Sequence, residues 1–238
     1  MLALVRSIAF AAVFYPLSVP IVLSAAVVAP FSARALAAVC RVWSQWHAVC
    51  ARALLGIRTV IEGEWPTGPV LVVFKHESMF EAVELPRLFD RPMIFAKAEL
   101  RRVPVWGWLG ERYAMVMIDR EGGAKTLRAM KALAAQAVAQ NRTLILLPEG
   151  TRVPHGEAPP LKSGFAGLYT LLRLPVVPIA VDSGRLSPPR SFIKRPGVIA
   201  YRVGDTIPPG LPRAEAEARV HKAINALNDE LPSLKGRG

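Results

Sequence analysis

The sequence predicts an α/β fold in which a largely parallel sheet is flanked by helices, with an apolar helical segment ahead of it. From residue 57 onward, short runs rich in β-branched residues alternate with longer helix-like runs, a pattern typical of parallel sheets covered by helices. Between Ser7 and Ala33 there is no charged residue, and this stretch is long enough for a membrane helix. The 238 residues suffice for one domain with a sizeable core plus an appendage.

The composition points to a membrane or another anionic partner. Apolar residues make up 52% of the chain and charged residues 20%, which argues against a disordered protein. The 30 Lys and Arg residues outnumber 18 Asp and Glu residues, so the formal net charge is +12. Such an excess fits a solvated basic face, nucleic acid, an anionic membrane surface or an anionic substrate. Because no stretch interleaves basic and aromatic residues as nucleic-acid-binding modules do, we favour the membrane and expect no nucleic-acid partner.

The apolar N-terminal segment contains prolines that leave its shape open. Pro16 and Pro20 predict either two short helices with a bend between them or one helix that continues through both residues. Arginines and aromatic residues suited to the lipid headgroup layer follow it: Arg34, Arg41, Trp43, Trp46, His47 and Arg52. We therefore assign residues 1–56 to N-terminal hydrophobic membrane anchor helices. A cleaved signal peptide or a buried pair of core helices are the alternatives.

The remaining residues, 57–238, are predicted to form one catalytic domain. Its expected strands are Val70–Phe74, Met93–Ala96, Ala114–Ile118, Thr143–Leu147, Val176–Val181 and Val198–Val203. Its expected helices are Glu81–Leu88, Ala124–Gln140, Gly164–Leu172 and Arg213–Leu231. Positive residues dominate after the apolar segment, which predicts that this domain lies on the cytoplasmic side of the membrane.

A histidine and a carboxylate follow the first expected strand of the catalytic domain. His76 would leave the sheet at the carboxyl end of that strand, where ligands gather in parallel sheets. Glu81 is five residues further on, so the two side chains meet only if His76 lies in the turn and Glu81 in the first helical turn. A carboxylate on one imidazole nitrogen leaves the other free to accept a proton. Taken alone, a histidine near an acid is more often structural than catalytic.

Three further segments place unusual residues at strand ends. Arg120, after the strand ending at Ile118, suits phosphate recognition, although for this segment alone a surface salt bridge to Asp119 or Glu121 is the preferred interpretation. In Leu147–Arg152, proline ends the strand, glycine allows close approach of a ligand, and Glu149 and Arg152 lie beside it. The fourth, Val176–Ala180, is by itself an apolar strand with a tolerated proline.

Together, and in this order, the four segments resemble the glycerolipid acyltransferase family, particularly its bacterial 1-acylglycerol-3-phosphate acyltransferases. The matching pieces are His76…Glu81, Ile118–Arg120, Pro148–Arg152, Val177–Ile179, and between them Ala96–Leu100 and Lys162–Gly164. The resemblance covers roughly residues 55 to 205. It implies a glycerol-3-phosphate acyltransferase-like fold whose N-terminal helices dock on one leaflet, here the cytoplasmic face of the inner membrane.

The resemblance also implies a reaction and a set of site residues. A fatty acyl chain would pass from acyl-carrier protein or acyl-CoA to the sn-2 hydroxyl of lysophosphatidate, giving phosphatidate for phospholipid biosynthesis. His76 would be the base and Glu81 would orient it. Residues expected to bind substrate are Lys75, Ser78, Lys97, Arg120, Glu149, Gly150, Thr151, Arg152 and Lys162. No metal and no bound cofactor are expected, because the thioester supplies the driving force.

Two departures from the family pattern keep alternatives open. Glu81 stands where the family usually has aspartate, and Lys75 stands where many members have asparagine. The acceptor could therefore be another lysolipid, such as a lyso-ornithine lipid, or the chain could be a non-catalytic lipid-binding relative. A serine hydrolase is disfavoured, because the sequence has no G-x-S-x-G motif. Glu77, Glu84 and His155 are not included in the expected site.

Overall fold

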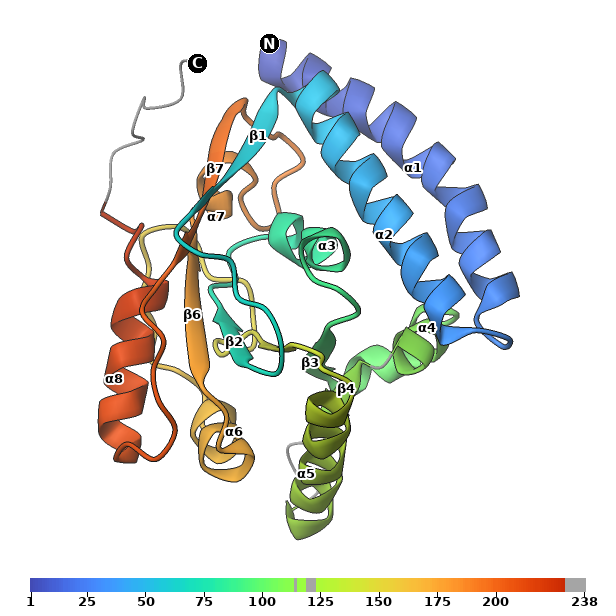
Figure 1. Ribbon diagram of the computed structural model, residues 1–238. Coiled ribbons are helices and arrows are strands. Elements are labelled where there is room, and N and C mark those ends of the chain that lie inside the picture. Colours follow the sequence, from blue (N-terminus) through green and yellow to red (C-terminus); the bar gives the residue numbers. More distant parts are fainter. Residues whose placement is uncertain (114, 119–122, 230–238) are drawn as a thin grey trace.

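A computed structural model of the chain describes residues 1–113, 115–118 and 123–229 (Figure 1). It begins with helix α1 (Leu2–Val28), helix α2 (Ala33–Cys50) and one π-helical turn, η1 (Ala51–Leu55). Strand β1 (Ile57–Glu62) follows directly. The remaining elements are β2 (Leu71–Phe74), α3 (Met79–Leu88), β3 (Met93–Lys97), η2 (Ala98–Arg102), α4 (Trp106–Tyr113), β4 (Val116–Ile118), α5 (Gly123–Ala139), β5 (Leu144–Leu146), α6 (Gly164–Leu172), β6 (Val176–Val181), α7 (Ser183–Leu186), β7 (Gly197–Val203) and α8 (Arg213–Ile224).

The seven strands form one sheet in the order β1-β7-β6-β2-β5-β3-β4. Every neighbouring pair is parallel except β6 and β7, which are antiparallel. The predicted α/β class and largely parallel sheet are therefore confirmed. The predicted strands and helices match observed elements to within a few residues, except that α8 is shorter than expected. Strand β1 and helices α4 and α7 were not predicted.

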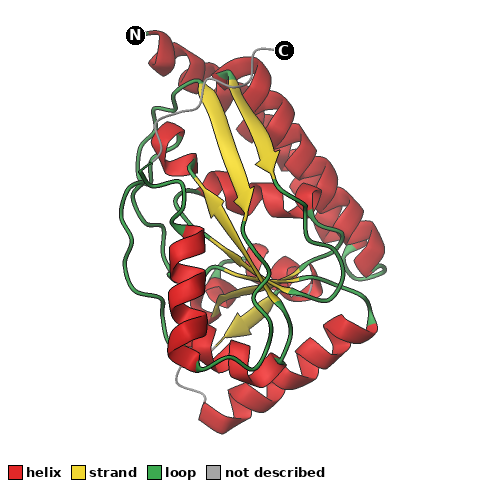
Figure 2. Cartoon of the chain, turned by 60° about the vertical axis from the view of Figure 1, so that its left-hand side comes forward, coloured by secondary structure: helices red, strands yellow, loops and turns green. Residues whose placement is uncertain are grey.

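Helices cover both faces of the sheet, as Figure 2 shows. Side chains alternate along β2, so that Val72 and Phe74 point to one hydrophobic cluster, whereas Leu71 and Val73 point to the other. The first cluster packs β2 and β7 against residues of α1, α2 and α3. The second packs β2 and β5 against residues of α5, α6 and α8. The N-terminal helices thus share a core with the sheet, while the division into 1–56 and 57–238 stays a prediction.

Helix α1 continues without a break through Pro16 and Pro20. Both prolines lie on the exposed side of the helix, so their missing N–H groups fall on the side away from α2 and the core. The chain turns instead near Pro30, after which the Ser32 hydroxyl caps α2 by accepting a hydrogen bond from the Ala35 N–H (3.1 Å). α1 and α2 consequently form a helical hairpin along one side of the molecule (Figure 1).

The length and composition of α1 would allow it to cross a membrane. In its most apolar stretch, only 17% of the residues are buried. A core helix of a soluble protein would be mostly buried, so α1 presents an apolar surface that the rest of the described chain leaves uncovered.

Candidate active site

The polar residues of the candidate site follow three adjacent parallel strands. β5, β2 and β6 are neighbours in the sheet and run in one direction, so their carboxyl ends meet at one edge. His76 comes two residues after β2, Glu149 three residues after β5, and Ser183 two residues after β6. Side chains far apart in sequence are thereby brought together, as expected for ligand sites in such sheets.

His76 and Glu81 form the pair that their spacing predicts. The His76 Nδ1 atom lies 2.9 Å from Glu81 Oε1. The Glu81 side chain is fully buried, while that of His76 is 13% exposed. Because a carboxylate accepts hydrogen bonds, Nδ1 carries the proton and Nε2 is left with a free lone pair. The imidazole is therefore oriented to accept a proton at Nε2.

Four further donors fix the Glu81 carboxylate. Oε1 accepts the backbone N–H groups of Glu77 and Ser78, both at 2.8 Å. Oε2 accepts the hydroxyls of Ser78 (3.0 Å) and Ser183 (2.5 Å). Since all its partners donate, the carboxylate acts purely as an acceptor, which is what an ionised carboxylate can do. Sequence reasoning missed Ser183; its position just after β6, at the same sheet edge, is the signal that could have identified it.

Glu149 holds the backbone of His76 in place. Its Oε2 accepts a hydrogen bond from the His76 N–H at 2.9 Å. Four residues further along the same loop, the Val153 N–H donates to the His76 carbonyl at 2.8 Å. Both backbone polar groups of His76 are thus bound by the loop after β5. This loop fixes where the histidine leaves the strand, which a side-chain pair alone would not do.

Lys75, Ser78 and Glu149 do not have the substrate-contacting positions expected from the sequence. All three are buried. Lys75 Nζ donates to Glu149 Oε1 (2.7 Å), Asn225 Oδ1 (2.7 Å) and the Glu157 carbonyl (2.8 Å), which uses all three of its hydrogens. Ser78 caps α3 by accepting the Phe80 N–H at 2.9 Å. The expectation is corrected: these residues support His76 and Glu81 from inside the protein.

Four of the other expected substrate-binding residues, Gly150, Thr151, Arg152 and Lys162, lie at or near the surface of the same sheet edge. Gly150 has a φ of 66°, which glycine adopts without strain. Thr151, Arg152 and Lys162 are exposed, and the Lys162 N–H donates to the Pro148 carbonyl at 3.0 Å, so Lys162 lies beside this loop. Two predicted residues cannot be placed as side chains. Lys97 ends β3 with its side chain outside the described part, and Arg120 lies outside the described residues.

A second histidine–glutamate pair lies beside the first. His155 Nδ1 is 3.0 Å from Glu77 Oε1, and Glu77 Oε2 accepts the Gly184 N–H at 2.8 Å. Glu77 is fully buried, and this burial raises the pKa of its carboxyl to about 8, with the nearby Glu81 charge adding to the rise. Burial also lowers the pKa of His155. In this pair, a neutral Glu77 carboxyl therefore donates a hydrogen bond to a neutral His155 imidazole. In the first pair, the Glu81 carboxylate only accepts hydrogen bonds.

The chain is similar to known acyltransferases. The model of the family described as Acyltransferase matches residues 57–182. The 1-acyl-sn-glycerol-3-phosphate acyltransferase of Pseudomonas aeruginosa is 29% identical over 188 residues, which are 78% of this chain and 70% of that protein. That of Helicobacter pylori is 30% identical over 134 residues, and the match spans 56% of each chain.

The fold has a counterpart among solved structures. The crystal structure of the 1-acyl-sn-glycerophosphate (LPA) acyltransferase PlsC from Thermotoga maritima superposes with a TM-score of 0.73 at 18% identity, covering 98% of this chain and 96% of that one. At this identity the likeness concerns the fold. Because the family match spans more than half of the chain and includes His76, Glu81 and Glu149, the protein belongs to the acyltransferase family.

The buried Lys75–Glu149 ion pair gives a stability prediction. Lys75→Met should cost about 3–5 kcal/mol of unfolding free energy, because it leaves the Glu149 carboxylate buried without its cation. Adding Glu149→Gln removes that charge, and the amide oxygen still accepts the His76 N–H. Denaturant unfolding of the detergent-solubilised protein should therefore find the double variant more stable than Lys75→Met alone.

The exposed pair Arg219 and Glu215 provides the matched control for this cycle. Arg219→Met and Glu215→Gln should have small effects that add within about 0.5 kcal/mol. Equally additive effects at Lys75 and Glu149 would contradict the buried pair.

The Glu77 carboxyl gives a pH prediction. In the unfolded chain it ionises near its ordinary pKa of 4.5, whereas in the folded protein it keeps its proton to about pH 8. The folded state thus binds more protons between these values, and stability from this group is lost as the pH rises toward 8. The Glu77→Gln side chain stays neutral at every pH. The difference in thermal unfolding midpoint, variant minus wild type, should therefore increase as the pH rises and become constant above about pH 8. The exposed Glu64→Gln should show a constant difference; the same constant difference for Glu77→Gln would refute the neutral carboxyl.

Proposed function

We propose that this protein transfers a fatty acyl chain from an acyl thioester to the sn-2 hydroxyl of lysophosphatidate, giving phosphatidate. The observation that carries the proposal is the His76–Glu81 hydrogen bond of 2.9 Å, in which Nε2 is free to accept a proton. The names of relatives in several organisms, 1-acyl-sn-glycerol-3-phosphate acyltransferases, support the acceptor. An intact and fully hydrogen-bonded pair argues against a lipid-binding relative that has lost catalysis.

The chain's own residues account for each proton movement. The acceptor hydroxyl gives its proton to His76 Nε2 while its oxygen attacks the thioester carbonyl carbon. Glu81, held by its backbone and hydroxyl donors, stabilises the imidazolium that forms. The tetrahedral intermediate then expels the thiolate, which takes the proton from the imidazolium. The products are the new ester and a free thiol, so neither a redox step nor a resident cofactor enters the scheme. We propose that acyl-carrier protein or acyl-CoA supplies the thioester.

The acceptor phosphate is proposed to bind the basic side chains at the same sheet edge. Arg152 and Lys162 are exposed there, and neither has an ion-pair partner among the described residues. Lys97 is the last residue of β3, and Arg120 comes two residues after β4 in the sequence. The carboxyl ends of both strands lie at this edge, because these strands are parallel to β5. Guanidinium and ammonium groups are the usual ligands of a phosphate. A headgroup held there leaves the glycerol hydroxyl to reach His76.

The protein is proposed to work at the cytoplasmic face of the inner membrane. Large apolar side chains exposed along α1 are Leu2, Leu4, Val5, Ile8, Tyr15, Leu17, Val19, Val22, Leu23 and Val27. Near the far end of the hairpin, the stretch from η2 to α4 exposes Val103, Val105, Trp106 and Trp108. Together these residues favour attachment to the lipid leaflet from which the acceptor comes.

The catalytic proposal is tested by acyl transfer in detergent micelles. His76→Ala should lose essentially all turnover, and Glu81→Gln should lose about 10²–10⁴-fold in kcat, because the imidazolium then lacks its carboxylate. Acceptors in the assay are lysophosphatidate, other lysolipids and glycerol phosphate, with both thioester donors. Circular dichroism should show unchanged secondary structure for both variants. Full activity of His76→Ala would overturn the mechanism, and transfer only to another lysolipid would overturn the acceptor.

The phosphate assignment is tested at Arg152. Arg152→Gln should raise KM for lysophosphatidate about tenfold or more while leaving KM for the acyl donor within about threefold, because a charged hydrogen bond to the phosphate is lost. Arg173→Gln is the matched control, since this exposed arginine precedes β6 at the opposite edge of the sheet. Equal increases in both KM values for Arg152→Gln would contradict the assignment.

A further inference from the structure

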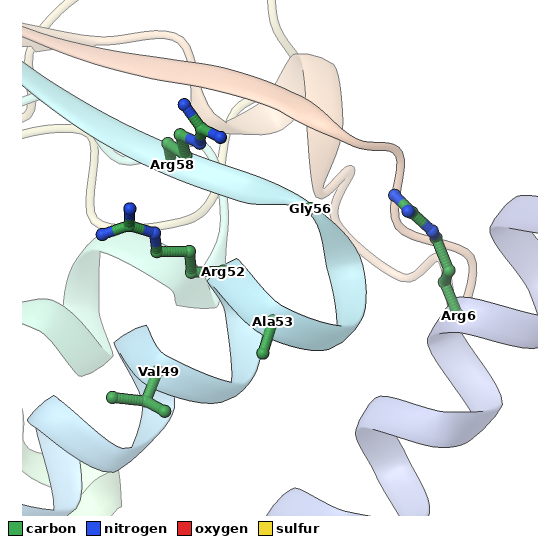
Figure 3. Close-up of a pocket in the computed structure, with 6 residues that line it drawn as sticks. All are labelled: Arg6, Val49, Arg52, Ala53, Gly56 and Arg58. Carbon is green, nitrogen blue, oxygen red and sulfur yellow. The ribbon is translucent and has the colours of Figure 1, made fainter.

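A basic pocket lies where α1, η1 and β1 meet. Its volume is about 510 Å³, within the range of small-ligand sites. Figure 3 shows the six residues that line it: Arg6, Val49, Arg52, Ala53, Gly56 and Arg58. Three of the six are arginines, and none is acidic. The resemblance to acyltransferases and the proposed mechanism leave this pocket without a role.

The three arginines come from three different elements. Arg52 and Arg58 are exposed and extend from η1 and β1 toward the same side of the junction (Figure 3). Arg6 reaches the junction from α1 and is partly buried, and its Nη1 donates to the Leu55 carbonyl at 3.3 Å. The same nitrogen packs so close to Gly56 that an added Cβ there would lie 2.5 Å from it. Packing and a hydrogen bond therefore hold one of the three guanidinium groups in place.

No carboxylate neutralises these arginines in the described part of the chain. The ion pairs that involve arginines in this part of the chain are made by other arginines. The side-chain hydrogen bond found for the three pocket arginines goes from Arg6 to the backbone carbonyl of Leu55. Three like charges around one pocket repel each other, and a bound anion would offset that repulsion. Carboxylate and phosphate oxygens both match the fork of the guanidinium group, and phosphate is the anion that a phospholipid headgroup presents.

The surroundings of the pocket are apolar. Val49 is 57% exposed within it. On α1, Leu2 lies about one turn before Arg6 and is 68% exposed, and the adjacent Val5 is 60% exposed. A soluble anion would gain nothing from these side chains, whereas the acyl or glycerol part of a lipid would cover them. Arginine beside exposed apolar residues is the arrangement found at the lipid headgroup layer.

The pocket is separate from the active site but lies toward the same end of the sheet. β1 is parallel to β7, β7 is antiparallel to β6, and β6 is parallel to β2. β1 therefore runs opposite to β2, so the amino end of β1 lies toward the same edge of the sheet as the carboxyl end of β2, which His76 follows. Because β7 and β6 lie between β1 and β2, the two sites are three strands apart. One membrane surface could thus contact the pocket while lipid enters the active site.

We propose that Arg6, Arg52 and Arg58 form a second lipid-binding site that takes the phosphate of an anionic membrane phospholipid. The site is non-catalytic, and it sets the height and tilt of the α1–α2 hairpin on the bilayer. The proposal rests on the membrane attachment in the proposed function, but not on the reaction at His76.

Vesicle co-sedimentation tests the proposal with the full chain. Wild type should bind vesicles of phosphatidylcholine plus phosphatidylglycerol more tightly than vesicles of phosphatidylcholine alone. Arg52→Gln/Arg58→Gln should lose about tenfold or more of the affinity for the anionic vesicles, since each arginine near the surface contributes independently. Its turnover in detergent micelles should match wild type, which separates this site from the catalytic proposal.

The matched control removes two positive charges from another surface of the protein. Arg213 and Arg219 lie on α8, on the opposite side of the molecule from α1 (Figure 1). The double variant Arg213→Gln/Arg219→Gln should therefore change vesicle affinity by less than about threefold. Equal losses for the two double variants would overturn the site in favour of a general charge effect.

Two further arms identify the source of the anion. If inorganic phosphate raises the thermal unfolding midpoint of wild type but not of Arg52→Gln/Arg58→Gln, and vesicle binding is the same for both, the site takes free phosphate and the lipid assignment is wrong. If the double variant instead raises KM for acyl-carrier protein or acyl-CoA without losing vesicle affinity, the pocket belongs to the donor and the proposal fails.

Discussion

The candidate active site depends on the buried ion pair between Glu149 and Lys75, because the Glu149 carboxylate accepts hydrogen bonds from Lys75 Nζ and from the His76 N–H at the same time. A carboxylate buried to this extent is very unfavourable without a cation, and Lys75 is the cation that permits it. Lys75 in turn bonds to Asn225 beyond α8 and to the Glu157 carbonyl, so the C-terminal part and the loop after β5 are tied to the same point. The position of His76, the proposed base, is consequently set by contacts among three segments of the chain.

The N-terminal hairpin is joined to this site through α3, the helix that carries Glu81. The Ser44 hydroxyl of α2 donates to the Val83 carbonyl of α3 at 2.7 Å, and the His47 ring packs on Phe80 with centroids 4.9 Å apart. Within the hairpin, Trp43 Nε1 donates to the Ser18 hydroxyl at 3.0 Å. The apolar hairpin therefore packs directly against the helix that carries Glu81. In the proposed function, a hairpin attached to a lipid leaflet would hold His76, the proposed base, at a fixed depth relative to a lipid hydroxyl.

The two neighbouring histidine–glutamate pairs differ in what surrounds the carboxyl group. Glu81 receives hydrogen bonds from two backbone N–H groups, two serine hydroxyls and His76. Glu77 has the Gly184 N–H and His155 as its partners, and burial together with the Glu81 charge raises its pKa. The first pair is therefore suited to stabilising an imidazolium, and the second to holding the loop around residue 155 against the turn that carries His76 without adding a second charge.

The sequence by itself determined the fold class, most of the sheet, and the pairing of His76 with Glu81, because alternation, strand-end position and a five-residue spacing are local properties of the chain. It did not identify β1 as a strand, whose partner β7 lies about 140 residues further along. Nor did it identify the hydrogen bonds of Ser183 with Glu81 and of His155 with Glu77. It also assigned Lys75 and Glu149 to substrate, where the structure buries them against each other. Only the tertiary structure decided these points, because the strand order β5-β2-β6 brings together residues that are 70 to 110 positions apart in sequence. Burial decides whether a charged side chain faces substrate or protein, and burial follows from this packing rather than from local sequence.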